Sequence, residues 1–123
     1  MHFMLLFNSP LSDLERKRDD PDSTAHWEAW RAYITALNDA GVVRRGDALT
    51  PPTMATTVRV REGRRQIHDG PFADTKEMLG GYVVIDVASL DEALEWAARS
   101  PSSRLGSTEI RPVDGVGAGQ RVG

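Results

Sequence analysis

The chain has 123 residues, of which 40% are hydrophobic and 27% charged, with a net charge of −3. This length predicts one domain with one modest core, and the negative charge argues against a general nucleic-acid-binding protein. No apolar run approaches the ~20 residues of a membrane span and no signal peptide is evident, so we expect a cytoplasmic protein that does not bind membranes. The absence of cysteine excludes disulfides, thiolate catalysis and thiolate metal sites.

The first elements expected are a strand and a polar segment. Residues 3–7 are apolar at every position, which is typical of a short strand buried on both faces. Residues 11–22 are strongly charged and include a proline, so we expect a solvated loop or a poorly ordered helix start.

Residues 23–40 carry the strongest helix signal in the chain. Trp27, Trp30, Ile34 and Leu37 recur at steps of 3, 4 and 3, which is the spacing of one helix face. Such stripes usually pack on a sheet. The alternative is that these aromatic rings line a ligand site.

A second strand and a hairpin are expected in the middle of the chain. An extended segment over residues 42–49 ends at Pro51-Pro52, because proline donates no ladder hydrogen bond. Residues 56–68 alternate in polarity around Glu62-Gly63, which predicts a hairpin with a two-residue turn. Residues 69–78 are expected to form a loop or a short helical turn.

The last third predicts strand, helix and strand. Residues 82–87 form a second run that is apolar on both sides. Ser89 and Glu92 form a capping box that opens a helix, and Ser100-Pro101 ends it because the residue before proline disfavours helical angles. Residues 108–113 are the last expected strand.

This order predicts an α+β fold, a ferredoxin-like βαββαβ sandwich with an inserted β-hairpin. We expect a single domain over residues 1–113 and a flexible tail over residues 114–123. Both helices would cover one face of the sheet, which leaves apolar side chains of the first strand on the other face. Their exposure would be costly, so we expect a homodimer packed sheet against sheet.

Residues 69–77, Asp-Gly-Pro-Phe-Ala-Asp-Thr-Lys-Glu, resemble the signature of DGPF-domain proteins, a branch of the YCII-related family. The resemblance extends over nearly the whole chain. Its further matches are His2-Phe3-Met4-Leu5-Leu6, Ala40-Gly41-Val42-Val43, Gly46-Asp47-Ala48-Leu49, Ala55-Thr56-Thr57-Val58-Arg59, Leu79-Gly80-Gly81-Tyr82, the segment 90–97 and Glu109-Ile110-Arg111-Pro112-Val113.

The resemblance implies a dimeric α/β-barrel of the ferredoxin-like type. It also implies a small-molecule enzyme, because YCII relatives were proposed to act through a His–Asp pair in a cleft and a chloro-aromatic dehydrochlorinase is related. This chain has Trp30 near the place of the family's histidine, and His26 one turn earlier. DGPF proteins often accompany extracytoplasmic-function sigma factors, which implies a regulatory alternative.

Two carboxylates are candidates for acid/base chemistry. Asp69 follows the hairpin and precedes Gly70-Pro71, where it either caps a tight turn or acts as a general acid or base. Asp47, at the end of the second strand, is the other residue that could handle a proton. Lys76 would receive an anionic substrate, although its charged neighbours are equally typical of a solvated turn.

Histidines and hairpin residues complete the candidate set. His26 and His68 are the internal imidazoles, the natural bases near pH 7, although a lone histidine is more often structural. We expect Phe72, Arg59 and His68 to contact substrate; the alternatives are a hydrophobic peg for Phe72 and a soluble, charge-protected edge for Arg59. These residues show no metal-ligand spacing, and we expect no metal or other cofactor.

Two functions therefore stay open. One is a small-molecule enzyme or binding protein that uses acid/base chemistry on a small anionic or aromatic substrate. Its pocket would lie between the open sheet face, Asp47 and the 69–77 loop. The other is a non-catalytic partner of a sigma factor.

Overall fold

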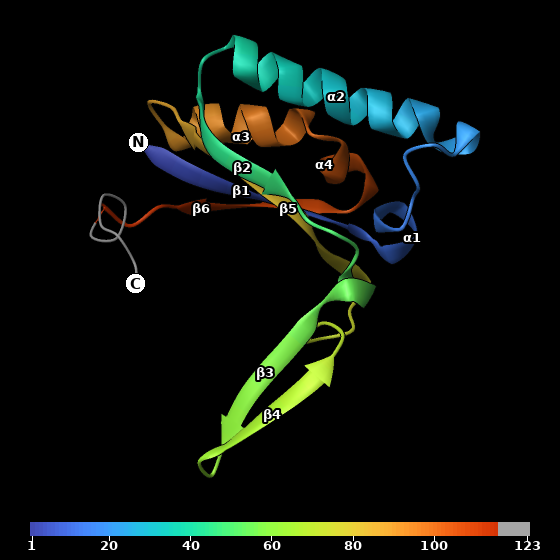
Figure 1. Cartoon of the computed structure of the whole chain (residues 1–123). Coiled ribbons are helices and arrows are strands. Elements are labelled where there is room, and N and C mark those ends of the chain that lie inside the picture. The colour runs from blue at the N-terminus through green and yellow to red at the C-terminus, as the bar shows by residue number, and fades with distance from the viewer. Residues whose placement is uncertain (116–123) are drawn as a thin grey trace.

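The structure is a computed structural model that describes residues 1–115, and its main sheet has four antiparallel strands in the order β2-β5-β1-β6. These strands are β1 (His2–Pro10), β2 (Val43–Ala48), β5 (Glu77–Asp86) and β6 (Ser107–Pro112) (Figure 1). The α+β class is confirmed. The two runs that are apolar on both sides lie at the centre of the sheet, as predicted for the ferredoxin-like order.

Strand β1 distinguishes the two faces of the sheet. Phe3, Leu5 and Phe7 are buried, whereas Met4 and Leu6 between them are only half-buried. Because successive side chains of a strand point to opposite faces, the first set faces the helices and the second set lies on the outer face. For β1, which was predicted to be buried on both faces, burial is therefore complete only on the face that the helices cover.

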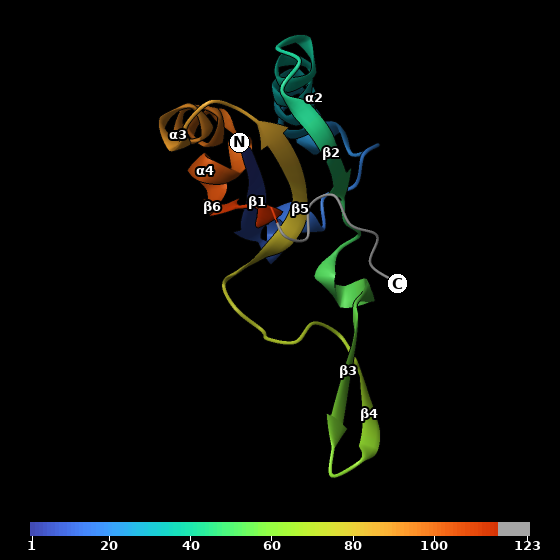
Figure 2. The same ribbon diagram turned by 90° about the vertical axis from the view of Figure 1, so that its left-hand side faces the viewer.

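Helices α2 (Thr24–Asp39) and α3 (Leu90–Arg99) lie on the same side of the sheet (Figure 2). Helix α4 (Pro101–Leu105) follows α3 after Ser100, where the predicted helix end is confirmed. Even α2, with 16 residues, does not qualify as a membrane-crossing helix, and no other helix of residues 1–115 does. The buried core between these layers comprises Phe3, Leu5, Phe7, Tyr33, Leu37, Val83, Ile85, Val87, Ala93 and Ala97.

The segment expected to be a solvated loop or a poorly ordered helix start contains two short helices and is attached to the body of the protein. It contains α1 (Leu11–Leu14) and a short 3-10 helix, η1 (Pro21–Ser23). Arg16 joins the two, because its Nε lies 3.0 Å from Asp13 Oδ1 and its Nη1 lies 3.0 Å from Ser23 Oγ. Both partners of Arg16 are buried, so this segment forms one end wall of the helix layer.

A two-stranded hairpin lies in the segment for which one was predicted, and it stands apart from the main sheet. Strands β3 (Thr56–Arg61) and β4 (Arg64–Asp69) pair only with each other and follow the 3-10 helix η2 (Pro52–Met54). The turn Glu62-Gly63 has positive φ at both residues, 53° and 73°, as a tight hairpin turn requires. The hairpin projects away from the body of the molecule (Figures 1 and 2).

Strand β5 begins earlier than expected. It starts at Glu77 rather than at residue 82, because residues 77–79 pair with the end of β1 after a register shift. The loop predicted over residues 69–78 is correspondingly shorter. Most of the tail predicted to be flexible, residues 116–123, lies outside the described residues.

Candidate functional site

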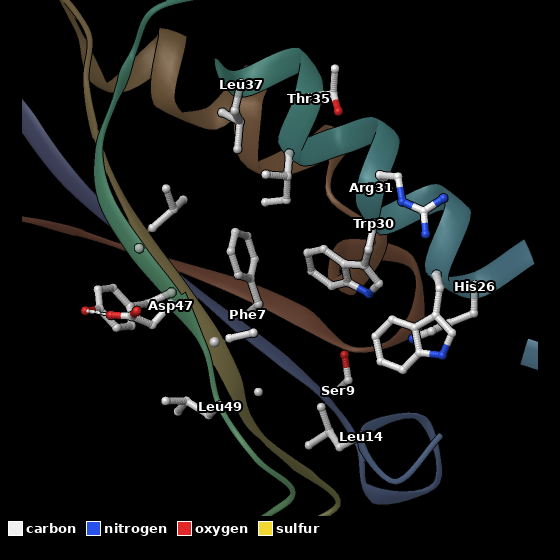
Figure 3. Close-up of a pocket in the computed structure, with 18 of the residues that line it drawn as sticks. Phe7, Ser9, Leu14, His26, Trp30, Arg31, Thr35, Leu37, Asp47 and Leu49 are labelled. Atoms are coloured by element: carbon white, nitrogen blue, oxygen red, sulfur yellow. Dashed lines mark hydrogen bonds between the residues drawn. The ribbon is translucent and has the colours of Figure 1, made fainter. Parts of the chain in front are cut away.

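A cleft of about 550 Å³ opens between helix α2 and the β2–β5 side of the sheet (Figure 3). It lies on the helix side because β2 is an edge strand that α2 does not cover, and Gly46 and Ala48 of β2 are exposed there. Its lining residues include Phe7, Asp13, Leu14, Arg18, His26, Trp27, Trp30, Arg31, Ile34, Asn38, Gly46, Ala48, Gly80 and Gly81.

The floor of the cleft is formed by glycines. A Cβ atom at Gly46 would lie 2.8 Å from the backbone oxygen of Tyr82, and one at Gly81 would lie 2.9 Å from the backbone oxygen of Asp47. Neither position has room for a side chain. The two strands therefore approach closely, and a ligand above them would meet backbone rather than side chains.

The wall opposite this floor is aromatic. The predicted stripe of α2 has two roles, since Leu37 and Trp30 belong to or pack against the core and also border the cleft, whereas Trp27 and Ile34 line the cleft. Trp30 packs edge-on against Phe7, with ring centroids 5.1 Å apart and an interplanar angle of 72°. Core packing therefore accounts for part of the stripe, and all four residues border the cleft.

Polar groups gather at the end of the cleft near α1. His26 stands edge-on to Trp27, with centroids 4.7 Å apart, and the Arg18 guanidinium lies over the same indole at 4.2 Å. Asp13 is 9% exposed and forms an ion pair with Arg16 Nε at 3.0 Å.

The environment of His26 favours its unprotonated form. Burial lowers the pKa of His26 below the ordinary value of 6.5, and the positive charge of Arg16 lowers it further, while Asp13 opposes both. At neutral pH the imidazole can therefore accept a proton, and Asp13 lies close enough to stabilise the cation that results.

Asp47 does not direct its carboxylate into the cleft. The residue borders the cleft, but its Oδ2 accepts a hydrogen bond of 2.7 Å from the Tyr82 hydroxyl. Figure 3 shows Asp47 on the far side of the strands from Phe7 and Trp30. This hydrogen bond raises the pKa of Tyr82.

The remaining candidates lie on or near the hairpin, away from the cleft. Asp69 is exposed at the end of β4, opposite Thr56, and His68 is exposed beside it. The Arg59 guanidinium lies over the Phe72 ring at 4.6 Å, so these two predicted contacts are brought together. Lys76 is exposed in the loop that precedes β5.

The main cleft therefore differs in place from the expected pocket, which was to lie on the open face of the sheet. A more open hollow of about 450 Å³ does lie near the predicted loop, between Pro51, Pro52, Phe72 and Leu79. It contains no histidine, and Asp47 and Asp69 are not among its lining residues.

Sequence reasoning missed Asp13 and Arg18 as site residues. Both belong to the charged segment that was interpreted as a solvated loop, and they approach His26 only because α1 folds back beneath α2. A possible signal was Leu14, an apolar residue within that charged segment, which lines the cleft. Within residues 1–115, no three histidine or acidic side chains gather closely enough to hold a metal ion.

Three comparisons relate the chain to known proteins. The family model described as the YCII-related domain matches residues 1–115. An uncharacterised protein of Rhizobium meliloti (strain 1021) is 46% identical over 85 residues, which cover 68% of this chain and 65% of that protein, less than two thirds of its length.

The third comparison concerns a solved structure. It is 5-chloro-2-hydroxyhydroquinone dehydrochlorinase from Burkholderia phenoliruptrix AC1100, in complex with 2,5-dihydroxybenzoquinone. The two chains share 16% identity with a TM-score of 0.53, over 93% of this chain and 94% of the other. At that identity the likeness shows a common fold.

Proposed function

The chain belongs to the YCII-related family, and we propose that its cleft binds a small aromatic molecule with an acidic hydroxyl group, from which His26 removes a proton. The single observation that carries this proposal is the position of His26. A half-buried imidazole with a lowered pKa stands beside the indole of Trp27, at the end of a cleft that Trp30 also lines and that has a glycine floor.

The size and the lining of the cleft are compatible with a small aromatic ligand. A volume of about 550 Å³ lies within the range of small-molecule sites. The indoles of Trp27 and Trp30 offer apolar faces and edges to an aromatic ligand, and the absence of side chains at Gly46 and Gly81 lets the ring approach the strands.

The charged residues of the cleft can stabilise an anion that forms when the bound ligand loses a proton. The proton of the ligand hydroxyl moves to an imidazole nitrogen of His26, which leaves a phenolate and an imidazolium. Asp13 stabilises the imidazolium, and the Arg18 guanidinium, which also lines the cleft, stabilises the phenolate. Deprotonation of this kind is the first step of an elimination from a substituted phenol, so a small aromatic substrate is favoured.

A direct test uses nuclear magnetic resonance with two probes. The probes are 2,5-dihydroxybenzoquinone, which the structural neighbour binds, and 4-nitrophenol, whose absorption spectrum reports ionisation. We expect either probe to shift the indole N–H signals of Trp27 and Trp30 and to leave that of Trp96, which is not among the lining residues, unchanged. Unchanged Trp27 and Trp30 signals at millimolar probe would overturn the proposed site.

The role of His26 has its own test. His26→Gln should retain binding of 4-nitrophenol but lower the ionised fraction of the bound probe at mildly acidic pH, at which most of the free probe is protonated, because the glutamine amide cannot accept the proton. The matched control is His68→Gln, on the exposed hairpin, which should ionise the bound probe like the unmodified protein. If the two variants behave alike, the base role is wrong. A chain that binds neither probe and captures a purified sigma factor would instead support the regulatory alternative.

We further propose that the protein is a homodimer joined by the outer faces of its sheets. Met4 and Leu6 of β1 are half-buried on that face, as is Tyr82 of β5, which pairs with Leu6, whereas Val84, which pairs with Met4, is already fully buried. A second copy would cover this apolar centre. Sedimentation should give twice the 13.5 kDa of the chain, and Leu6→Arg should give monomers. A stable monomer of the unmodified chain at micromolar concentration would contradict the proposal.

A further inference from the structure

Arg31 is a charged residue of the cleft that has no partner within residues 1–115. It lies on helix α2 and lines the cleft, yet its side chain makes no hydrogen bond, ion pair or ring contact there. Other charged side chains of the lining are engaged. Asp13 pairs with an arginine at 3.0 Å, Asp47 accepts a hydrogen bond of 2.7 Å from a tyrosine hydroxyl, and the Arg18 guanidinium lies 4.2 Å from the centroid of an indole.

Arg31 belongs to a row of polar side chains on α2. Arg31, Thr35 and Asn38 recur at steps of 4 and 3, which places them on one face of the helix. All three are exposed and line the cleft. Within the described part of the chain, the side chains of Thr35 and Asn38 have no hydrogen-bond partner either. The helix therefore presents polar groups to a ligand beside its indoles.

The charge of the cleft favours an anion. The acidic residues of α2, Glu28 and Asp39, are not among the lining residues. Two arginines line the cleft, and the Asp13 and Asp47 carboxylates already have partners. The cleft is therefore positive, although the whole chain carries −3. A concave site with one sign of charge attracts ligands of the opposite sign.

The side chain and its neighbours favour a carboxylate on an aromatic ring. A guanidinium is a planar fork that can donate two parallel hydrogen bonds to a carboxylate. Figure 3 shows Arg31 on the same wall of the cleft as Trp30 and His26. Because residues four apart are neighbours on a helix surface, a ring that contacts the Trp27 indole brings its substituents near Arg31.

We propose that Arg31 binds a carboxylate group of the ligand, so that the cleft takes a hydroxy-substituted aromatic acid. This inference rests on the proposed function and names the ligand class of the same site. The hydroxyl group faces His26, and the carboxylate meets Arg31. The two residues are five positions apart, which is about 7.5 Å along the helix axis. Substituents on opposite carbons of one ring can therefore meet both residues at once.

The test compares 4-hydroxybenzoate with 4-hydroxybenzamide, in which a neutral amide of nearly the same shape replaces the carboxylate. Binding is measured from the indole N–H signals of Trp27 and Trp30. We expect the unmodified protein to bind the acid about fivefold more tightly, because solvent weakens an exposed ion pair. Arg31→Gln should abolish this preference and leave the affinity for the amide unchanged. Arg45→Gln is the matched control, because Arg45 is exposed on β2 and does not line the cleft.

Salt provides a second measurement. The preference for the acid should disappear as the salt concentration rises to about 1 M, at which charges are screened over a few ångströms, whereas the affinity for the amide should stay the same.

The outcomes separate the two proposals. Equal affinities of the unmodified protein for the two compounds would overturn the carboxylate site and leave the aromatic cleft standing. A preference that survives Arg31→Gln, or that Arg45→Gln abolishes as well, would also overturn the role of Arg31. If neither compound moves the indole signals at millimolar concentration, the proposed function itself fails.

Discussion

The Tyr33 hydroxyl donates a hydrogen bond of 2.9 Å to the backbone oxygen of Trp96 and so joins the two long helices across the core. Tyr33 is 5% exposed, and burial raises the pKa of its hydroxyl far above the ordinary value. The hydroxyl therefore remains a donor at neutral and mildly alkaline pH. This bond holds α3 against α2, whose other side lines the cleft.

We predict that Tyr33→Phe lowers the free energy of unfolding by about 1–2 kcal/mol, because it removes one hydrogen bond and leaves a carbonyl oxygen unpaired in the core. Urea denaturation measures the change. The control is Tyr82→Phe, whose hydroxyl bonds to Asp47 at the surface, and its cost should be smaller. If both substitutions lower the free energy of unfolding equally, the hydrogen bond between the helices stabilises the fold no more than a surface hydrogen bond does.

The capping box at the start of α3 supplies a second prediction. The Glu92 amide donates to Ser89 Oγ at 3.2 Å, and the Ala88 amide donates to the Glu92 carboxylate at 3.3 Å. Ser89→Ala should destabilise the protein by about 1 kcal/mol, since it leaves one amide of the first turn without a partner. Ser89→Asp should retain most of the stability in the same urea measurement. If the aspartate variant loses as much stability as the alanine variant, the loss does not come from the missing helix cap.

Elements with strong local signals were predicted well from the sequence. The capping box opens α3, the period of the apolar residues marks α2, and the Glu62-Gly63 turn closes the hairpin. Each of these signals acts within a few residues, so no knowledge of the rest of the fold is needed to interpret it.

Features that depend on distant parts of the chain were not predicted. The early start of β5 follows from pairing with the end of β1, which no local pattern in residues 77–81 reveals. The cleft likewise results from the position of α2, which leaves the edge strand β2 uncovered. Asp13 becomes part of a site only when Arg16 joins α1 to η1. The DGPF segment drew attention to Asp69, yet the structure places that carboxylate outside the cleft.

The glycine floor gives a third prediction. Gly46→Ala should destabilise the protein by about 1–3 kcal/mol, because the new methyl group meets rigid backbone of β5 rather than a movable side chain. The same variant should weaken probe binding in the cleft, since β2 must shift to accommodate the methyl group. Ala48→Ser, on the same strand and also lining the cleft, is the control and should change stability by less than about 0.5 kcal/mol. A stable Gly46→Ala variant with unchanged binding would contradict this account of the floor.

The charges around His26 give the last prediction. The imidazole should titrate below 6.5 in nuclear magnetic resonance, because burial and Arg16 lower its pKa. Arg16→Gln should move the midpoint up and Asp13→Asn should move it down, since the two neighbours act in opposite directions. A histidine whose pKa is lowered on folding binds its proton more readily when unfolded, so it costs no stability above 6.5 and destabilises the fold as the pH falls below that value. His26→Gln should therefore reduce the loss of stability between neutral and mildly acidic pH. A midpoint that moves the same way in both charge variants would show that these two neighbours do not control the imidazole.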